Sequence, residues 1–232
     1  MSIILFFKIC NLSIILRERG IRLGANSENG LPISRWLKRK NKKRGISLKK
    51  YIKVPLTKEI IRELKAGDYV YITGTIYTAR DAAHKRLFDA MCQKKEIPLP
   101  LENNVIYYLG PTPAKEGQVI GSAGPTTSSR MDKYTPMLLE NGLKGMIGKG
   151  KRSKEVIESI IKNGAVYFAA VGGAGALLSK CIKKSEVIAY DDLGTEAIRK
   201  LEVEQLPVIV VVDCNGNNLY ETATEEYRTI KL

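Results

Sequence analysis

The stretch from Gly121 to Asp132 holds the residues of this chain best suited to chemistry. Its glycines allow the backbone to approach a ligand closely, and the hydroxyls of residues 126–129 offer hydrogen-bond donors. Arg130 adds a planar guanidinium that matches a pair of anionic oxygens. This combination predicts a loop that binds a carboxylate. A solvated loop that caps a following helix would show the same residue types, so both interpretations stay open on this stretch alone.

A second polar cluster runs from Gly74 to Arg86 and follows an apolar segment at 69–72. A strand, a glycine loop and a helix in this order frame many anion sites. Arg80 and His84 are four residues apart, which places both on one face of a helix. His84 is the only histidine of the chain. Because no second imidazole or nearby cysteine accompanies it, the sequence does not indicate a metal site here.

Two further glycine-rich segments suggest nucleotide loops but fail their motifs. Residues 145–151 match the first part of a phosphate-loop pattern, yet Arg152 stands where the motif needs Ser or Thr. We therefore reject nucleotide binding there and predict a cationic loop in which Lys149, between two glycines, can reach an acid. Residues 171–177 lack the spacing of a dinucleotide fingerprint and indicate close backbone packing at a strand end.

As a set, these clusters and the segment from Asp192 to Glu204 resemble the class I fumarase family. More narrowly, they are similar to its C-terminal half, which in many prokaryotes is a separate beta subunit of fumarate hydratase or of the related L-tartrate dehydratase. The resemblance covers about residues 48 to 225 in the right order and with similar spacing. It implies a cytoplasmic hydro-lyase that adds or removes water across the double bond of a four-carbon dicarboxylic acid. For fumarate this is a step of the tricarboxylic acid cycle, and fumarate and tartrate are not separable from this sequence.

The resemblance also implies a cofactor and partners. In the family, three cysteines of the alpha half hold a [4Fe–4S] cluster that leaves one iron open as a Lewis acid. Here the four cysteines are scattered and none forms a ligand-spaced pair: Cys10, Cys92, Cys181 and Cys214. We therefore expect the cluster to belong to a partner alpha subunit and this chain alone to bind none. Dimers of alpha–beta pairs are the assembly that the family suggests.

Carried over residue by residue, the resemblance implies that Arg80, Arg130 and Lys149 bind the substrate carboxylates. Thr126 would lie against the carbon that loses its proton. A threonine base is chemically demanding, because nearby cations must stabilise its alkoxide. The histidine with a catalytic role in the family belongs to the alpha half. Three residues of this chain are accordingly expected behind the site rather than on the substrate: Asp81, His84 and Thr127.

The net charge of +14 is concentrated at one end of the chain. Residues 1–50 hold 13 Lys and Arg against 2 Asp and Glu, whereas the remainder holds 25 against 22. The apolar stretch near the start falls short of the roughly 20 residues that span a bilayer and lacks a signal-peptide pattern. The basic run at 35–44 leaves a nucleic-acid-binding module as the alternative function. For the folded part we expect neither a nucleic-acid nor a membrane partner.

We divide the chain at residue 48. Residues 1–47 form a predicted extension that is poorly structured, or an over-extended reading of the gene with the true start near Ser47. Residues 48–232 form the predicted hydro-lyase domain.

The elements that must position the site alternate along the chain. Strands are expected near 69–73, 104–109, 117–121, 144–147, 165–170, 186–190 and 207–213. Helices are expected near 80–93, 130–141, 153–163, 175–181 and 194–200. Such alternation predicts an α/β layered domain. The family resemblance sharpens this to a swivelling β/β/α domain with the glycine-rich loops at one edge. A turn at Asn215-Gly216 is expected to lead into a hairpin at residues 219–220.

Overall fold

The computed structural model of the protein describes residues 49–170 and 173–226, with side chains up to residue 223. The predicted extension at 1–47 and the predicted division at residue 48 lie outside these ranges.

One sheet contains every strand of the described residues: β1 (Lys50–Lys53), β2 (Tyr69–Thr78), β3 (Val105–Tyr107), β4 (Gly145–Gly148), β5 (Val166–Ala169), β6 (Ile182–Ala189) and β7 (Ile198–Val212). The α-helices are α3 (Lys58–Glu63), α4 (Asp81–Cys92), α5 (Thr135–Glu140), α6 (Lys154–Asn163), α7 (Gly175–Leu178) and α8 (Leu219–Glu226). Short 3₁₀ turns occupy η1 (Ser128–Met131), η2 (Ser179–Cys181) and η3 (Asp191–Glu196).

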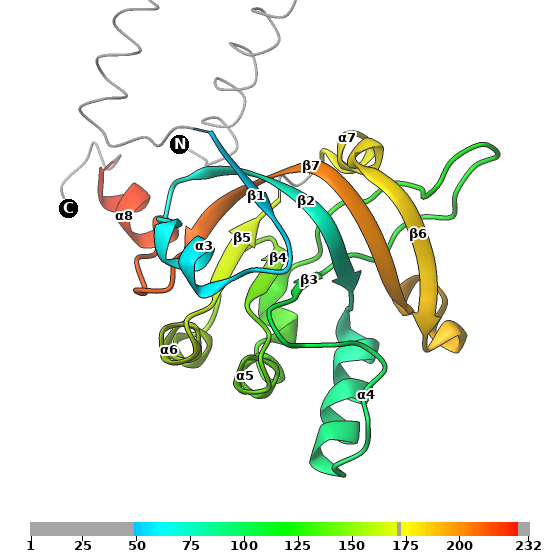
Figure 1. Ribbon diagram of the computed structural model, residues 1–232, viewed down its shortest axis with the longest axis horizontal. Helices are drawn as coiled ribbons and strands as arrows, with labels where there is room; N and C mark the ends of the chain where they lie inside the picture. Colours follow the sequence, from blue (N-terminus) through cyan, green and yellow to red (C-terminus); the bar gives the residue numbers. More distant parts are fainter. Residues whose placement is uncertain (1–48, 171–172, 227–232) are drawn as a thin grey trace, which may run out of the picture. The chain divides into compact units, whose positions relative to one another are not determined.

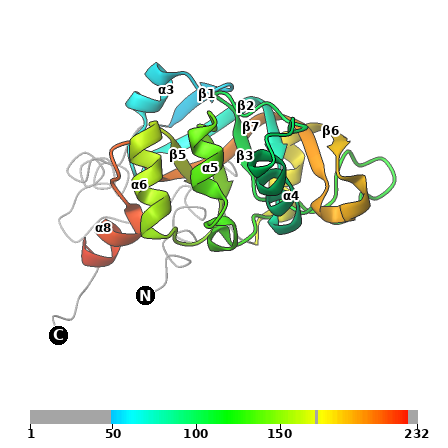
Figure 2. The ribbon, with the colours of Figure 1, turned by 90° about the horizontal axis from the view of Figure 1, so that it is seen from below.

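The sheet closes on itself through its longest strand. Its order is β1-β2-β3-β4-β5-β7-β6, and β7 pairs with β2 as well. Neighbours from β1 to β5 are parallel, whereas β7 runs antiparallel to β2, β5 and β6. Strands β2, β3, β4, β5 and β7 therefore form a closed ring. Helices α4, α5 and α6 connect the successive parallel strands and lie together on the outer side of β3, β4 and β5 (Figures 1 and 2). The predicted α/β class is confirmed, with layers in the order β/β/α.

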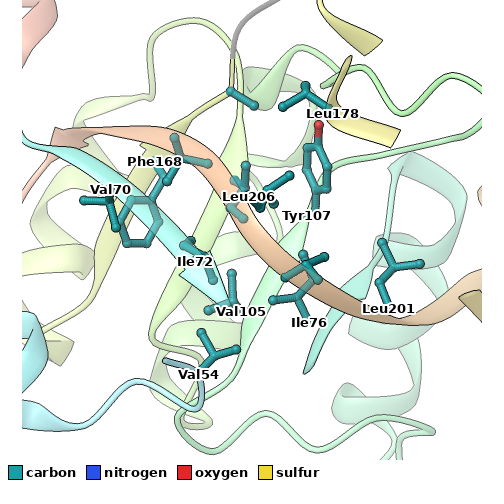
Figure 3. Close-up of a cluster of buried hydrophobic side chains, with 14 of the residues drawn as sticks. Val54, Val70, Ile72, Ile76, Val105, Tyr107, Phe168, Leu178, Leu201 and Leu206 are labelled. Atoms are coloured by element: carbon teal, nitrogen blue, oxygen red, sulfur yellow. The ribbon is translucent and has the colours of Figure 1, made fainter. Parts of the chain in front are cut away.

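Two apolar cores follow from the alternation of side chains along the strands. In β3, Val105 and Tyr107 point into the ring, whereas Ile106 packs toward the helices. Phe168 of β5 and Leu206 of β7 meet the first two inside the ring (Figure 3). Burying each large apolar side chain contributes roughly 1.5–3 kcal/mol. Both faces of the middle layer are thus buried, which fixes where its strand ends lie.

Helix α6 shows how local sequence sets the element boundaries. Ser153 caps its start by accepting a hydrogen bond from the backbone N–H of Val156. Gly164 ends the helix with φ +56°, a conformation that glycine adopts without steric cost. Val156 and Ile160, four residues apart, bury one face against the sheet.

Three predicted elements are wrong. The helix expected at 194–200 is instead the end of η3 and the start of β7, because Ile198, Leu201 and Val203 are buried between β2 and β6. The strand expected at 117–121 is a turn, and residues 112–119 are exposed. The hairpin expected at 219–220 is the start of α8. The helix expected at 130–141 is divided into η1 and α5, and Pro136 lies in the first turn of α5, where its missing N–H is tolerated.

Candidate functional site

The parallel strands bring three predicted site segments to one edge of the sheet. The carboxyl ends of β2, β3, β4 and β5 are in register, with Thr78 opposite Tyr107, and Tyr107 opposite Ile147. Arg80 follows β2 directly at the start of α4, and Lys149 follows β4 directly. Ligands of parallel α/β folds bind at such carboxyl edges, in open sheets and in closed barrels alike. The shared edge therefore explains why residues 69 positions apart come close together.

The loop that follows β3 returns to the same edge and ties Thr126 to Lys149. The Thr126 N–H donates to the Tyr108 carbonyl at 2.7 Å, and the Lys149 N–H donates to the Thr126 carbonyl at 3.2 Å. The Ser128 N–H donates in turn to the Lys149 carbonyl at 2.8 Å, and Thr127 forms a bridge with Lys149. The structure thus brings three of the predicted residues, Thr126, Thr127 and Lys149, into one backbone ladder.

Gly148 is required by this ladder. A β-carbon at Gly148 would overlap the Ser128 hydroxyl and would approach the Tyr108 ring to 2.8 Å. The glycine therefore allows the loop and the end of β4 to lie against each other.

Asp81 joins the two predicted arginines. Its carboxylate lies 2.6 Å from Arg130 Nε and 3.7 Å from Arg80 Nη2. Asp81 is the first residue of α4, where a negative charge is stabilised by the helix N-terminus. Arg130 belongs to η1, which begins directly after Thr127. It therefore joins this charged group to the ladder of Thr126 and Lys149. Arg130 is 52% exposed at its side chain, so its guanidinium is accessible to a ligand.

Glu196 belongs to the same charged group and was not predicted as a site residue. Its Oε1 lies 3.4 Å from Arg80 Nη2, and its Oε2 accepts the Ala82 N–H at 2.9 Å. The surrounding segment at 194–200 was expected to be a helix, whereas it is the end of η3 and the start of β7. Only the acidic residue itself, in a segment that carries the family resemblance, could have signalled this role.

His84 lies behind Arg80 and is fully buried. Its Nδ1 is 2.9 Å from the Arg80 carbonyl. Since a carbonyl only accepts, Nδ1 carries the proton and Nε2 is an acceptor, which has no hydrogen-bond partner among the described residues. Burial lowers the pKa of His84 to about 4, and the nearby Arg152 acts in the same direction. The imidazole is therefore neutral at pH 7 and packs edge-on against Tyr108 at 5.2 Å between ring centroids.

Arg152 is the buried centre of this region. In the sequence it served only as the residue that excludes a nucleotide loop. Its guanidinium lies 2.7 Å from Asp132 and donates to the Thr135 hydroxyl at 2.8 Å and to the Tyr108 hydroxyl at 3.2 Å. The rings of Tyr108 and Tyr167 lie 5.4 and 5.1 Å from its central carbon. Its side chain is 0% exposed. A charge buried this completely is stable only when it is paired and hydrogen-bonded on all sides.

The arrangement offers cationic side chains to an anionic ligand. Arg80 and Arg130 meet at Asp81, and Lys149 and Thr126 are joined by their backbones at the same edge. Within the described ranges, no group of three His, Cys, Asp or Glu side chains could hold a metal, and Cys92, Cys181 and Cys214 are free thiols. No helix in these ranges has the length and apolar character to cross a membrane.

Comparisons with known proteins identify the family of the chain. The family model described as "Fumarase C-terminus" matches residues 21–223. A protein of Methanocaldococcus jannaschii named "Putative L(+)-tartrate dehydratase subunit beta" is 37% identical over 177 residues, which are 74% of this chain and 91% of that protein.

Two fumarate hydratases are also similar. Fumarate hydratase 2 of Leishmania major is 37% identical over 178 residues, and the anaerobic class I fumarate hydratase of Escherichia coli is 39% identical over 169 residues. The matched region is 75% and 71% of this chain but only 31% of each of those proteins. The family match and the high coverage of the M. jannaschii protein lead to one conclusion: the chain belongs to the fumarase C-terminal family.

Proposed function

We propose that this chain is the beta subunit of a two-subunit hydro-lyase that interconverts fumarate and (S)-malate. The observation that carries the proposal is the meeting of Arg80, Arg130 and Lys149 with Thr126 at the carboxyl edge of the parallel strands. A four-carbon dicarboxylate brings two negative charges to this edge, and the three cations bind and orient them. Planar guanidinium groups suit carboxylates because they donate two parallel hydrogen bonds.

Thr126 is the proposed proton-abstracting residue. Its backbone is fixed on both sides by the hydrogen bonds to Tyr108 and Lys149, which keeps Thr126 beside the loop that carries Lys149. A threonine hydroxyl loses its proton only where positive charge stabilises the alkoxide. Lys149, whose N–H is bound to the Thr126 carbonyl, and Arg130, four residues along the chain, are the cations that the structure offers for this purpose.

The proposal assigns the [4Fe–4S] cluster to an alpha subunit. The described residues of this chain offer no ligand set for it. When bound, the cluster would supply a Lewis acid for the substrate hydroxyl and carboxylate. The lengths of the relatives support a divided enzyme, since the chain spans nearly all of a protein named subunit beta but about a third of the fumarate hydratases. We propose a cytoplasmic assembly of two alpha–beta pairs.

The test is anaerobic co-expression with the candidate alpha subunit, followed by an absorbance assay of malate and fumarate interconversion. Thr126→Ala and Arg130→Ala are expected to abolish activity without loss of the complex. Thr222→Ala on α8 and Arg62→Ala on α3 are matched controls, because both side chains are exposed and belong to other elements. Activity of the wild type without the alpha subunit, or full activity of the Thr126 variant, would overturn the proposal.

L-tartrate is the second candidate substrate, and the name of the M. jannaschii relative favours it. Dehydration of tartrate gives oxaloacetate, which can be assayed on the same complex. A cluster-loaded complex that is inactive on malate and fumarate but produces oxaloacetate would replace the first substrate with the second. Failure of the two chains to form a complex would contradict both.

A further inference from the structure

Beneath the candidate site lies a buried layer of four side chains: His84, Tyr108, Arg152 and Tyr167. We propose that Arg152, held between the two tyrosine rings, is the positioning residue that sets how Thr126 and Lys149 face each other. The inference rests on the proposed function for the meaning of those two residues. The contacts among the four buried side chains do not depend on that function.

Arg152 fastens three separate segments to one another. Its Nε pairs with Asp132 at 2.7 Å, and the second oxygen of that carboxylate accepts the Ser153 N–H at 2.7 Å. Its two terminal nitrogens donate to Thr135 on α5 and to Tyr108 after β3. A lysine could not replace it, since one ammonium lacks the fork of donors that reaches all three partners.

Tyr167 transmits the position of Arg152 to the loop of Lys149. Its hydroxyl donates to the Gly150 carbonyl at 2.9 Å and lies 2.8 Å from the Ser128 hydroxyl. Because the Tyr167 proton is used toward Gly150, the Ser128 hydroxyl donates to the Tyr167 oxygen. The Gly150 N–H donates to the hydroxyl of Tyr220 on α8 at 3.1 Å. The residue that follows Lys149 is therefore held at both its carbonyl and its N–H.

Tyr108 transmits the position of Arg152 to Thr126. Its carbonyl accepts the Thr126 N–H, while its ring and hydroxyl contact the guanidinium. On its other side, the ring packs against His84, which is bound to the Arg80 carbonyl. Both members of the Thr126–Lys149 pair are thus connected to the same guanidinium through one tyrosine each.

The experiment uses the full chain co-expressed with the alpha subunit and compares the wild type with Arg152→Lys and Tyr167→Phe. Tyr71→Phe is the matched control, since Tyr71 stacks on Tyr51 at the other end of β2. We measure kcat and KM per mole of intact complex, together with hydrogen exchange of peptides covering 122–131 and 146–152. Displacement of reacting groups by about 1 Å costs about 100-fold, so we expect a loss of that order in kcat/KM for Arg152→Lys. For Tyr167→Phe we expect about 5-fold, mainly through KM, because a hydrogen bond of about 1 kcal/mol is lost and the Lys149 loop loosens.

Exchange in the two site peptides should become faster in both variants, while exchange in β2 and β7 stays at the wild-type rate. A merely structural role would lower the yield or the unfolding temperature but leave KM per intact complex and the local exchange unchanged, and this result would overturn the inference. If Arg152→Lys does not assemble, Tyr167→Phe decides the matter by the same two readouts. A wild-type complex that is inactive on malate, fumarate and tartrate would refute the proposed function. In that case faster local exchange in the variants still supports the positioning role, and unchanged exchange refutes it.

Discussion

His84 is the only histidine of the chain, so the pH dependence of the free energy of unfolding near neutral pH can be assigned to one side chain. His84 is completely buried, and burial lowers its pKa from about 6.5 to about 4. The groups around it are the Arg80 carbonyl and Asp81, which favour the charged form, and Arg152, which opposes it. The ring of Tyr108 packs against it without charge. In the folded chain His84 is therefore neutral over a range of pH in which an unfolded histidine is already protonated.

The direction in which the free energy of unfolding changes with pH follows from this difference in pKa. Between pH 6.5 and pH 4 the unfolded chain binds a proton that the folded chain does not, so the free energy of unfolding falls as the pH falls. The contribution of His84 is fully present above pH 6.5 and declines below it. Each pKa unit corresponds to about 1.4 kcal/mol. Lowering the pH from 7.5 to 5 crosses about 1.5 units of this window, and we expect the free energy of unfolding to fall by about 2 kcal/mol.

Urea unfolding of the full chain and of His84→Asn, at a series of pH values from 7.5 to 5, isolates this amount. Asparagine does not titrate, and its side-chain N–H₂ can still donate to the Arg80 carbonyl. The carboxylates titrate mainly below pH 5 and are shared by both chains, so the difference between the two slopes reports His84 alone. Equal slopes, or an imidazole NMR titration of the native chain with a midpoint near 6.5, would refute the burial argument.

Three further predictions concern the site and its surroundings. Arg130→Lys keeps the charge but loses the planar fork. We expect KM to rise by about 10- to 100-fold, the equivalent of one charge-assisted hydrogen bond of about 1.5–3 kcal/mol, and an unchanged KM would exclude contact with a carboxylate. Gly148→Ala places a methyl group against a buried hydroxyl and a ring, and should lower the free energy of unfolding by about 1–3 kcal/mol in a denaturant titration. Gly124→Ala, whose added carbon meets only a backbone atom at 3.8 Å, is the control and should change it little. Removal of residues 1–47 should leave hydratase activity within about 2-fold and abolish any salt-sensitive binding of nucleic acid, so a large loss of activity on truncation would contradict the predicted division of the chain.

The parallel half of the fold could be predicted because its signals are local. Strands β3, β4 and β5 are short apolar runs, and each connecting helix has an apolar stripe between a polar start and a glycine or polar end. Strand β1, Lys-Tyr-Ile-Lys, has no such run and was not expected. Helix α4 was expected at 80–93 and lies at Asp81–Cys92, and α6 was expected at 153–163 and lies at Lys154–Asn163. Once the strands are parallel and adjacent, the site residues that follow β2 and β4 must meet at one edge. The position of Arg80 and Lys149 therefore required little beyond the order of the elements.

The antiparallel half could not be predicted in the same way, because its signals are not local. Around the start of β7 charged residues recur at helical spacing, with Glu196 at the end of η3 and Lys200 in β7 four residues apart. Only the pairing with β2 on one side and β6 on the other makes Ile198 and Leu201 buried strand residues, one in each apolar core. The ring closes through β2, which is more than a hundred residues from β7 in sequence, and a short window of sequence does not show this partner.

Arg152 presents the same difficulty within the site. In sequence it is one of several cations in a glycine-rich loop, and nothing local separates it from the exposed Lys149 and Lys151 on either side. Its burial arises because Tyr108, directly after β3, and Tyr167 of β5 both lie on the helix side of the sheet, where their rings pack against the flat guanidinium. The cation that is expected to touch substrate and the cation that holds the loop in place are three residues apart and chemically alike. The two roles differ because the tyrosine rings cover Arg152 and leave Lys149 exposed. A substitution at Arg152 should therefore change catalysis although its buried side chain is not expected to touch the substrate.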